Sequence, residues 1–245
     1  MFLFLPVLLA VQTRSRDQEL VRADAASLAR GKEILQRAQR AMGGADKLSA
    51  VKDVTHAMEI ALEPAAGGFK MKQISFYIAP NQIRQEQETP SGKVTFFTDG
   101  KSGWFAIPGG VQPMSADMLK QAKGVVFRQP STLMLSDRDP SRSVNALSEN
   151  AVEISTADGQ RVLVEFDPET GLPTRQIYTE LSASGGSAER AEILSDWRDV
   201  EGVKMPYRAV QQENGAKKLE VTVSEYKINS GITSEQLSKR PGVEK

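Results

Sequence analysis

The sequence contains no cysteine, which excludes disulfide bonds, thiolate metal sites, a cysteine nucleophile and the lipid-modified cysteine of a bacterial lipoprotein. A single histidine, His56, leaves no imidazole pair for a zinc site and one candidate imidazole base. Neither sign of charge is in excess, because 31 lysines and arginines balance 31 aspartates and glutamates. We therefore expect no metal, and no electrostatic attraction to nucleic acid or to an anionic membrane.

Sequence signatures of enzymes and nucleotide-binding proteins are also missing. No Gly-x-Gly-x-x-Gly follows a strand, and there is no P-loop, no Gly-x-Ser-x-Gly and no His-Glu-x-x-His. Carboxylates are numerous, but nearly all of them lie in turns or at outward strand positions, where solvation explains them. We therefore expect no catalytic residues, no cofactor and no enzymatic activity.

The N-terminus is apolar from Met1 to Val11, which is the length of a signal-peptide core and well short of the roughly 20 residues that span a bilayer. No basic residue precedes this run, whereas Arg14 and Arg16 follow it closely. We interpret residues 1–11 as the apolar region of a signal peptide and residues 12–26 as a polar linker. The remaining residues, 27–245, are expected to form a single domain of an exported, periplasmic protein.

Hydrophobic periodicity predicts one helix followed by many strands. Residues 27–42 have apolar side chains at helical spacing, and Gly43-Gly44 supplies the stop. From Val54 the period changes to two, and His56 falls on the apolar side, where a hydrogen-bonded histidine in a core or a cavity wall is expected. The predicted strands are 54–62, 69–79, 82–89, 93–98, 103–107, 152–155, 161–166, 174–181, 191–197, 203–210 and 219–228. Short connectors such as Asp158-Gly159 predict an antiparallel meander.

One long segment, residues 113–135, interrupts the strands. Ser115 is a candidate N-cap, and the apolar residues that follow it are mostly at helical spacing. Gly124 and Pro130 are expected to break the segment into two short helical pieces that join the two halves of the sheet. The charged residues 137–142 that follow are interpreted as a solvated surface turn.

A hairpin around Asp99-Gly100-Lys101-Ser102 carries aromatic residues on both strands. A four-residue loop places Phe97 opposite Trp104 and Phe96 opposite Phe105, so each face receives one aromatic pair. A sheet with water on one side would not be apolar on both faces. A curved sheet fits better, with a convex face that packs and a concave face that holds helices or an apolar ligand.

Several short motifs resemble one protein family. Residues 77–108 contain a Pro-Asn turn, an Asp-Gly-Lys-x-x-Trp-Phe hairpin and a following proline. Further similarities are the segment 129–135, the turn 167–173 and the closing Pro-Gly-Val at 241–243. Together they resemble the periplasmic outer-membrane lipoprotein carriers, the LolA-like lipoprotein-sorting proteins. The resemblance implies a mainly β (α+β) fold, in which a curved antiparallel sheet forms an unclosed β-barrel, helices cover its concave face, and a cavity there takes acyl chains.

One position departs from that family. Its members have an arginine before the proline of the Pro-Asn turn, where it helps to hold a lid closed, whereas this sequence has Ala79. This departure bears on whether lipoproteins are transferred. It does not bear on the presence of a cavity for lipid. Residues 113–135 are the candidate lid, with hinges expected at Gly124 and Pro130.

Large apolar residues near the hairpin and in the helical segment are the candidate ligand contacts, with ordinary core packing as the alternative for each. They are Phe76, Ile78, Ile83, Phe96, Trp104, Met118, Leu119 and Phe127. Alternation alone does not decide which face is concave.

Two functions are carried forward. The first is a non-catalytic, monomeric binding protein for a lipid, a lipoprotein acyl chain or another apolar ligand. The second is an accessory or protein-interaction domain with a filled core, associated with a peptidase or an envelope complex.

Overall fold

The computed structural model describes residues 25–181 and 186–242. The predicted signal peptide at 1–11, nearly all of the predicted linker at 12–26 and the residue Val243 lie outside the described residues.

A 13-stranded antiparallel sheet dominates the structure, in the order β6-β5-β4-β3-β2-β1-β13-β12-β11-β10-β9-β8-β7. The strands are β1 (Asp53–Leu62), β2 (Lys70–Ile78), β3 (Gln82–Thr89), β4 (Gly92–Thr98), β5 (Gly103–Ile107), β6 (Gly110–Pro113), β7 (Arg142–Ser148), β8 (Ala151–Thr156), β9 (Arg161–Phe166), β10 (Pro173–Leu181), β11 (Ser187–Val200), β12 (Val203–Glu213) and β13 (Ala216–Ile228). The helices are α1 (Ala25–Ala41), α2 (Ala45–Ala50), α3 (Ala116–Phe127), α4 (Pro130–Leu133) and α5 (Ser234–Ser238), with short 3-10 turns at Pro64–Ala66 and Ser136–Arg138.

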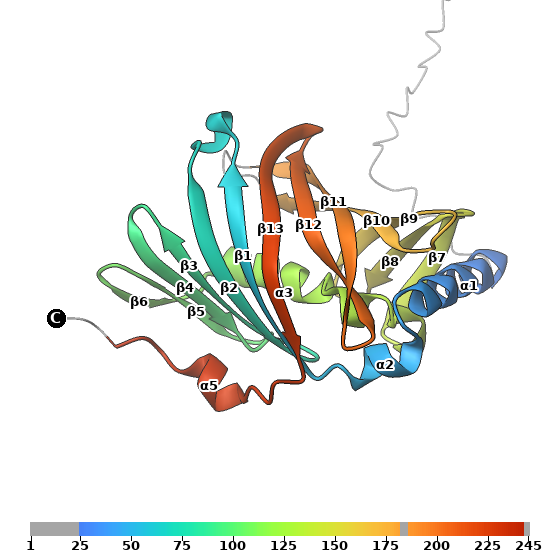
Figure 1. Cartoon of the computed structure of the whole chain (residues 1–245), viewed down its shortest axis with the longest axis horizontal. Coiled ribbons are helices and arrows are strands. Elements are labelled where there is room, and N and C mark those ends of the chain that lie inside the picture. Colours follow the sequence, from blue (N-terminus) through green and yellow to red (C-terminus); the bar gives the residue numbers. More distant parts are fainter. Residues whose placement is uncertain (1–24, 182–185, 243–245) are drawn as a thin grey trace, which may run out of the picture.

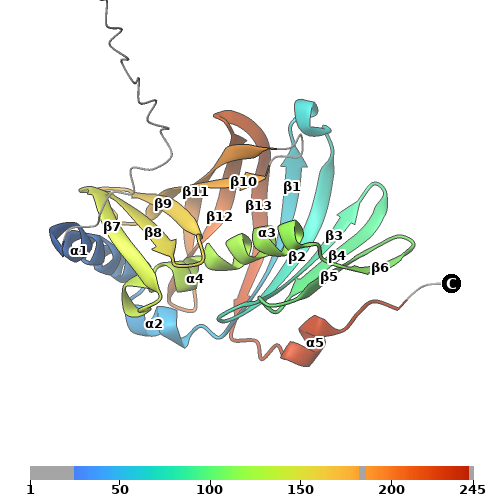
Figure 2. The same ribbon diagram turned by 180° about the vertical axis from the view of Figure 1, so that it is seen from behind.

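The first and the last strand lie side by side in the middle of the sheet. Strands β1 to β6 run in sequence to one end, α3 and α4 cross to the other end, and β7 to β13 run back until β13 pairs with β1. The sheet bends around α3, which crosses one of its faces in both views (Figures 1 and 2). The predicted meander and the open half-barrel are therefore confirmed.

The face of the sheet that α3 crosses, the concave face, carries the main hydrophobic core. Helix α1 packs against β7 and β8, and its Ile34 and Leu35 join Val152 and Val162 in one buried cluster. The two backbones come very close at Gly31, where an added Cβ would lie 2.5 Å from the carbonyl oxygen of Val144. Glycine at this position is what lets the helix approach the strand.

The predicted pairing across the aromatic hairpin is confirmed. Phe97 pairs with Trp104 and Phe96 pairs with Phe105, and the ring centroids are 5.7 and 6.4 Å apart. The pair Phe97–Trp104 lies on the convex face, where it is buried together with Leu237 of α5. Both faces can be apolar here because each is covered: α3 crosses the concave face, and the C-terminal segment covers the convex face.

The C-terminal segment is fixed to the convex face by polar contacts as well. Arg84 of β3 donates hydrogen bonds from Nη1 to the carbonyl oxygens of Leu237 and Lys239, at 2.9 and 2.6 Å. Thr233 and Gln236 form a capping box at the start of α5. The sequence analysis did not predict this helix.

Three other elements were missed, and one prediction was wrong. The end strands β6 and β7 and the short helix α2 were not predicted, and residues 187–190, which lie between the predicted strands 174–181 and 191–197, belong to β11. Gly124 does not break α3, which continues to Phe127; the break comes at Arg128–Gln129, and Pro130 opens α4. A glycine costs a helix only about 1 kcal/mol, and this one leaves room for Arg128, whose Nη1 would lie 2.9 Å from an added Cβ.

Candidate functional site

A cavity of about 370 Å³ lies between the concave face and the C-terminal end of α3. Strands β1, β2, β3 and β10 to β13 supply its walls, and Val125, Arg128, Gln129 and Pro130 border it on the helical side. This volume is within the range of about 300–1,000 Å³ that is typical of small-molecule sites. It is the candidate functional site.

The middle of the cavity wall is apolar, and cross-strand register builds it. Met58 of β1 pairs with Val223 of β13, and Ile60 pairs with Val221. Val221 in turn pairs with Ala209 of β12. All five side chains border the cavity. Because each neighbouring strand contributes an inward residue at the same level, the wall is continuous across the sheet.

On one side of this apolar region lies a polar row across three strands. His56 of β1 pairs with Ser75 of β2, and Ser75 pairs with Gln85 of β3. His56 also stacks on Tyr226, with ring centroids 5.1 Å apart. Burial lowers the pKa of His56 from its ordinary value of 6.5 to about 4, so the imidazole is neutral at neutral pH. His56 thus lies in a cavity wall, one of the two predicted places, but within the described residues its Nδ1 lacks the expected hydrogen bond.

Two atoms of this row are left without partners. Within residues 25–181 and 186–242, neither Nδ1 of His56 nor Oγ of Ser75 has a hydrogen-bond partner, although both atoms are buried. Ser75 as a whole is 1% exposed. Buried polar atoms in folded proteins are nearly always paired, so unpaired ones beside a cavity need an explanation.

A second polar row lies on the other side of the apolar region. Gln176 of β10, Glu192 of β11 and Gln211 of β12 are in register and border the cavity. Burial raises the pKa of Glu192. Its Oε1 lies 3.5 Å from the hydroxyl of Tyr178, which also accepts a hydrogen bond from Nε2 of Gln211 at 3.3 Å.

The C-terminal end of α3 is held against this second row by an ion pair. Arg128 donates from Nη2 to Oε1 of Glu180 at 2.5 Å, and its guanidinium lies 3.4 Å from the ring centroid of Tyr178. These three residues also border an adjacent groove of about 520 Å³ between α3 and strands β8 to β11. They therefore form the partition between the cavity and that groove.

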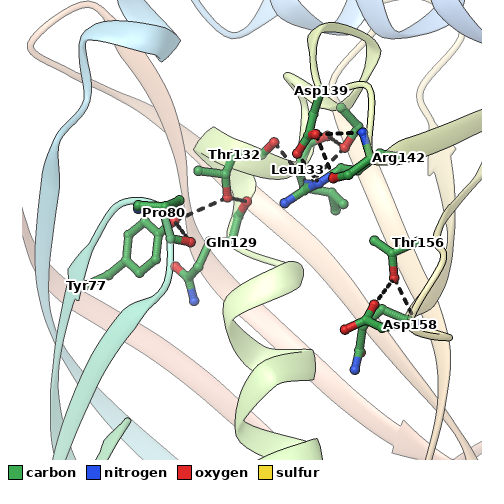
Figure 3. Close-up of polar contacts among 12 residues, drawn as sticks. Tyr77, Pro80, Gln129, Thr132, Leu133, Asp139, Arg142, Thr156 and Asp158 are labelled. Carbon is green, nitrogen blue, oxygen red and sulfur yellow. Dashed lines mark hydrogen bonds and ion pairs between the residues drawn. The ribbon is translucent and has the colours of Figure 1, made fainter. Parts of the chain in front are cut away.

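Further contacts anchor the short helix α4, as Figure 3 shows. The hydroxyl of Tyr77 donates to the carbonyl oxygen of Pro80 at 3.1 Å and lies 3.4 Å from Oγ1 of Thr132. On the other side, Arg142 donates to the carbonyl oxygen of Thr132 at 3.3 Å and pairs with Asp139 at 3.2 Å. Arg142 is thus part of the packing, and not simply the end of a solvated turn. In this chain, which has Ala79 beside the Pro-Asn turn, Tyr77 and Arg142 fix the helical segment.

The structure separates the eight predicted ligand contacts into different environments. Phe76, Ile78 and Trp104 come together on the convex face with Phe97. Ile83 and Phe127 come together in the main core. Phe96, Met118 and Leu119 are half-buried. None of the eight is among the described residues that line the cavity. Their contact with a ligand stays a prediction.

The residues that do line the cavity were mostly missed because many of them are polar. Gln73 and Ser75 lie four and two residues before the buried Tyr77 in β2. Residues at this spacing share one face of a strand, so they are marked as inward-facing. In β3 the signal is absent, since Gln85 and Gln87 lie in a run that is polar on both faces.

Two further findings concern the whole of the described chain. No group of three or more histidine, aspartate or glutamate side chains suited to a metal ion occurs in the described residues. Every helix in the described part of the chain is too short or too polar to cross a membrane.

Comparisons with known proteins identify the fold. No protein-family model matches the sequence, and no curated protein matches it significantly. Among solved structures, a LolA superfamily protein from Nitrosomonas europaea matches with a TM-score of 0.56 and 13% identity, covering 85% of this chain and 97% of that one. An outer membrane lipoprotein-sorting protein domain from Vibrio parahaemolyticus matches with a TM-score of 0.54 and 13% identity, covering 86% and 97%. A DUF1329 family protein from Desulfovibrio piger matches with a TM-score of 0.56 and 10% identity, also covering 86% and 97%. The chain therefore has a LolA-like fold.

Proposed function

We propose that this protein is a non-catalytic, extracytoplasmic binding protein that holds a lipid, a lipoprotein acyl chain or another apolar ligand in its concave cavity. The observation that carries the proposal is the space of about 370 Å³ between the curved sheet and α3, whose central wall is apolar. Each methylene that leaves water for such a wall contributes about 0.8 kcal/mol. Burial alone can therefore retain an alkyl chain, and no reactive group is required.

The LolA-like fold supports a place in lipoprotein or lipid sorting. We further propose that the protein acts in the periplasm and as a monomer. This role does not require the family's arginine at position 79, because Tyr77 and Arg142 fix the helical segment in this chain. An accessory domain for a peptidase or an envelope complex, with a filled core, is the competing function. It predicts that no small apolar molecule binds.

A cavity-filling variant tests the proposal. Ala209 borders the cavity, and the next residue on β12, Val210, points to the opposite face of the sheet. We expect purified wild-type protein to bind the neutral fluorescent probe N-phenyl-1-naphthylamine saturably, with one site. Ala209→Trp should weaken this binding at least tenfold, because the indole occupies the space, whereas Val210→Trp should leave it within about twofold.

Two results would count against the carrier function. One is the absence of saturable probe binding to the folded wild-type protein. The other is equal loss of binding in Ala209→Trp and Val210→Trp, which would place the probe outside the cavity. Native mass spectrometry of protein purified from the periplasm would show a bound lipid directly.

A further inference from the structure

The cavity is not uniformly apolar. The first polar row, formed by His56, Ser75 and Gln85, indicates which ligand head groups can bind. His56 and Ser75 are cross-strand partners that both border the cavity. In the described part of the chain, Nδ1 of the first and Oγ of the second have no partner. Leaving such atoms unpaired in a buried place is unfavourable, so a molecule that offers them hydrogen bonds gains binding free energy that a plain hydrocarbon does not.

The charges around the cavity indicate that this molecule has no ionised head. Among its lining residues within 25–181 and 186–242, Arg128 is the one cation, and Glu180 already pairs with it. His56 is neutral, because burial lowers its pKa to about 4. Glu192 and Glu180 are the acidic groups. A carboxylate or phosphate in the cavity would lose its hydration without meeting a free cation, which is costly.

The chemistry of the unpaired atoms narrows the head group further. A hydroxyl both donates and accepts a hydrogen bond, so it complements the imidazole nitrogen in either tautomer and the serine hydroxyl as well. An ester or amide oxygen is a suitable acceptor for Ser75 and for the amide of Gln85, which is in register beside it. The apolar residues Met58 and Val223 border the cavity next along the strands from His56 and Tyr226. A head at the polar row would therefore place its chain on the apolar wall.

We propose, on the basis of the proposed function, that the cavity selects amphiphiles with an uncharged, hydroxyl-bearing head of the acylglycerol type. The head forms hydrogen bonds with Ser75 and His56, and the cavity discriminates against carboxylate and phosphate heads. The polar row is then a specificity-determining part of the site. The apolar wall supplies affinity that does not depend on the head.

Matched ligands and one small substitution test this selectivity. Three compounds with the same chain length, 1-monomyristoylglycerol, myristate and tetradecyl phosphate, would compete with N-phenyl-1-naphthylamine at pH 7.5, each as a monomer below its aggregation limit. We expect monomyristoylglycerol to bind at least tenfold more tightly than either anion, which corresponds to about 1.4 kcal/mol.

The variant Ser75→Ala should reduce this preference severalfold, since it removes one oxygen from the row formed by His56, Ser75 and Gln85. The preference is taken as the ratio of the affinities of the same variant for monomyristoylglycerol and for the anions. Thr95→Val is the matched control, because Thr95 is also buried, at 2% exposure, but lies on the convex face with Ala106. It should retain the full preference.

The outcomes separate the two proposals. If the probe itself does not bind to wild-type protein, the carrier function fails. If the probe binds but myristate or tetradecyl phosphate competes as well as monomyristoylglycerol, the carrier function stands and head selection is refuted. An unchanged preference in Ser75→Ala would also refute it.

Discussion

His56 should make the stability of the protein fall as the pH drops from neutral to 4. Its pKa in the folded protein is about 4, against 6.5 for an unburied imidazole, because burial disfavours the charged ring. Between these two values the unfolded chain binds a proton that the folded chain does not, so acid favours unfolding. The contribution is fully present above pH 6.5 and is lost as the pH falls towards 4.

The difference between the two pKa values corresponds to about 3 kcal/mol between pH 7.5 and pH 4. Urea unfolding of the wild type and of His56→Gln over this range would measure it. The glutamine variant stays neutral, so its free energy of unfolding should fall by about 3 kcal/mol less than that of the wild type. Carboxylates that titrate in the same range contribute to both proteins and cancel in the comparison.

The sequence contains one histidine, so its imidazole signals can be followed by NMR without ambiguity. We expect the ring to stay neutral down to about pH 5. A ring that titrates near 6.5 would show that His56 is hydrated, and so would an equal fall in the free energy of unfolding of the two proteins. Head-group selection, which depends on unpaired and buried polar atoms at His56 and Ser75, would then lose its basis.

Packing makes two further predictions. Gly31→Ala should destabilise the protein by about 1–3 kcal/mol in urea unfolding, because the added Cβ would lie 2.5 Å from the carbonyl oxygen of Val144. Gly124→Ala, the helical control, meets the end of a side chain, Nη1 of Arg128 at 2.9 Å, and not backbone, and it gains up to about 1 kcal/mol of helix propensity, so it should cost less than Gly31→Ala; the reverse order would contradict this packing. Leu237→Ala should cost about 2–5 kcal/mol, because Leu237 is 1% exposed, and a loss below 1 kcal/mol would show that α5 does not hold the convex face.

Much of the sheet could be predicted from the sequence, because alternation of side chains is a local signal. The interior strands β3, β5 and β9 have the predicted bounds, and the others differ by a few residues. The two end strands, β6 and β7, were missed for a physical reason. An end strand pairs on one edge, so β6 tolerates Pro113. In β7 the buried position next to Val144 is the polar Asn145, so no alternation of apolar and polar residues marks the strand.

The cavity was harder to predict because its location depends on contacts between distant parts of the chain. The sequence showed that Phe96 and Phe97 face opposite sides, but not which side is concave. That choice depends on α3 crossing one face and α5 covering the other, and α5 begins more than 130 residues after Phe97. Polar residues such as Ser75 share a face with the buried Tyr77, but it is the register that places them beside His56.

The central pairing of β1 with β13 has a consequence for how the protein is made. Val54 pairs with Ile228, so the innermost seam of the sheet joins the first long strand to the last one. A ribosome releases β13 long after β1, and until then β1 has an unpaired edge in the middle of the future sheet. Loss of the final strand would therefore open the molecule at its centre rather than shorten it at a margin. In a circularly permuted chain that begins at α3 and ends at β6, β13 and β1 would be consecutive strands in the order of synthesis.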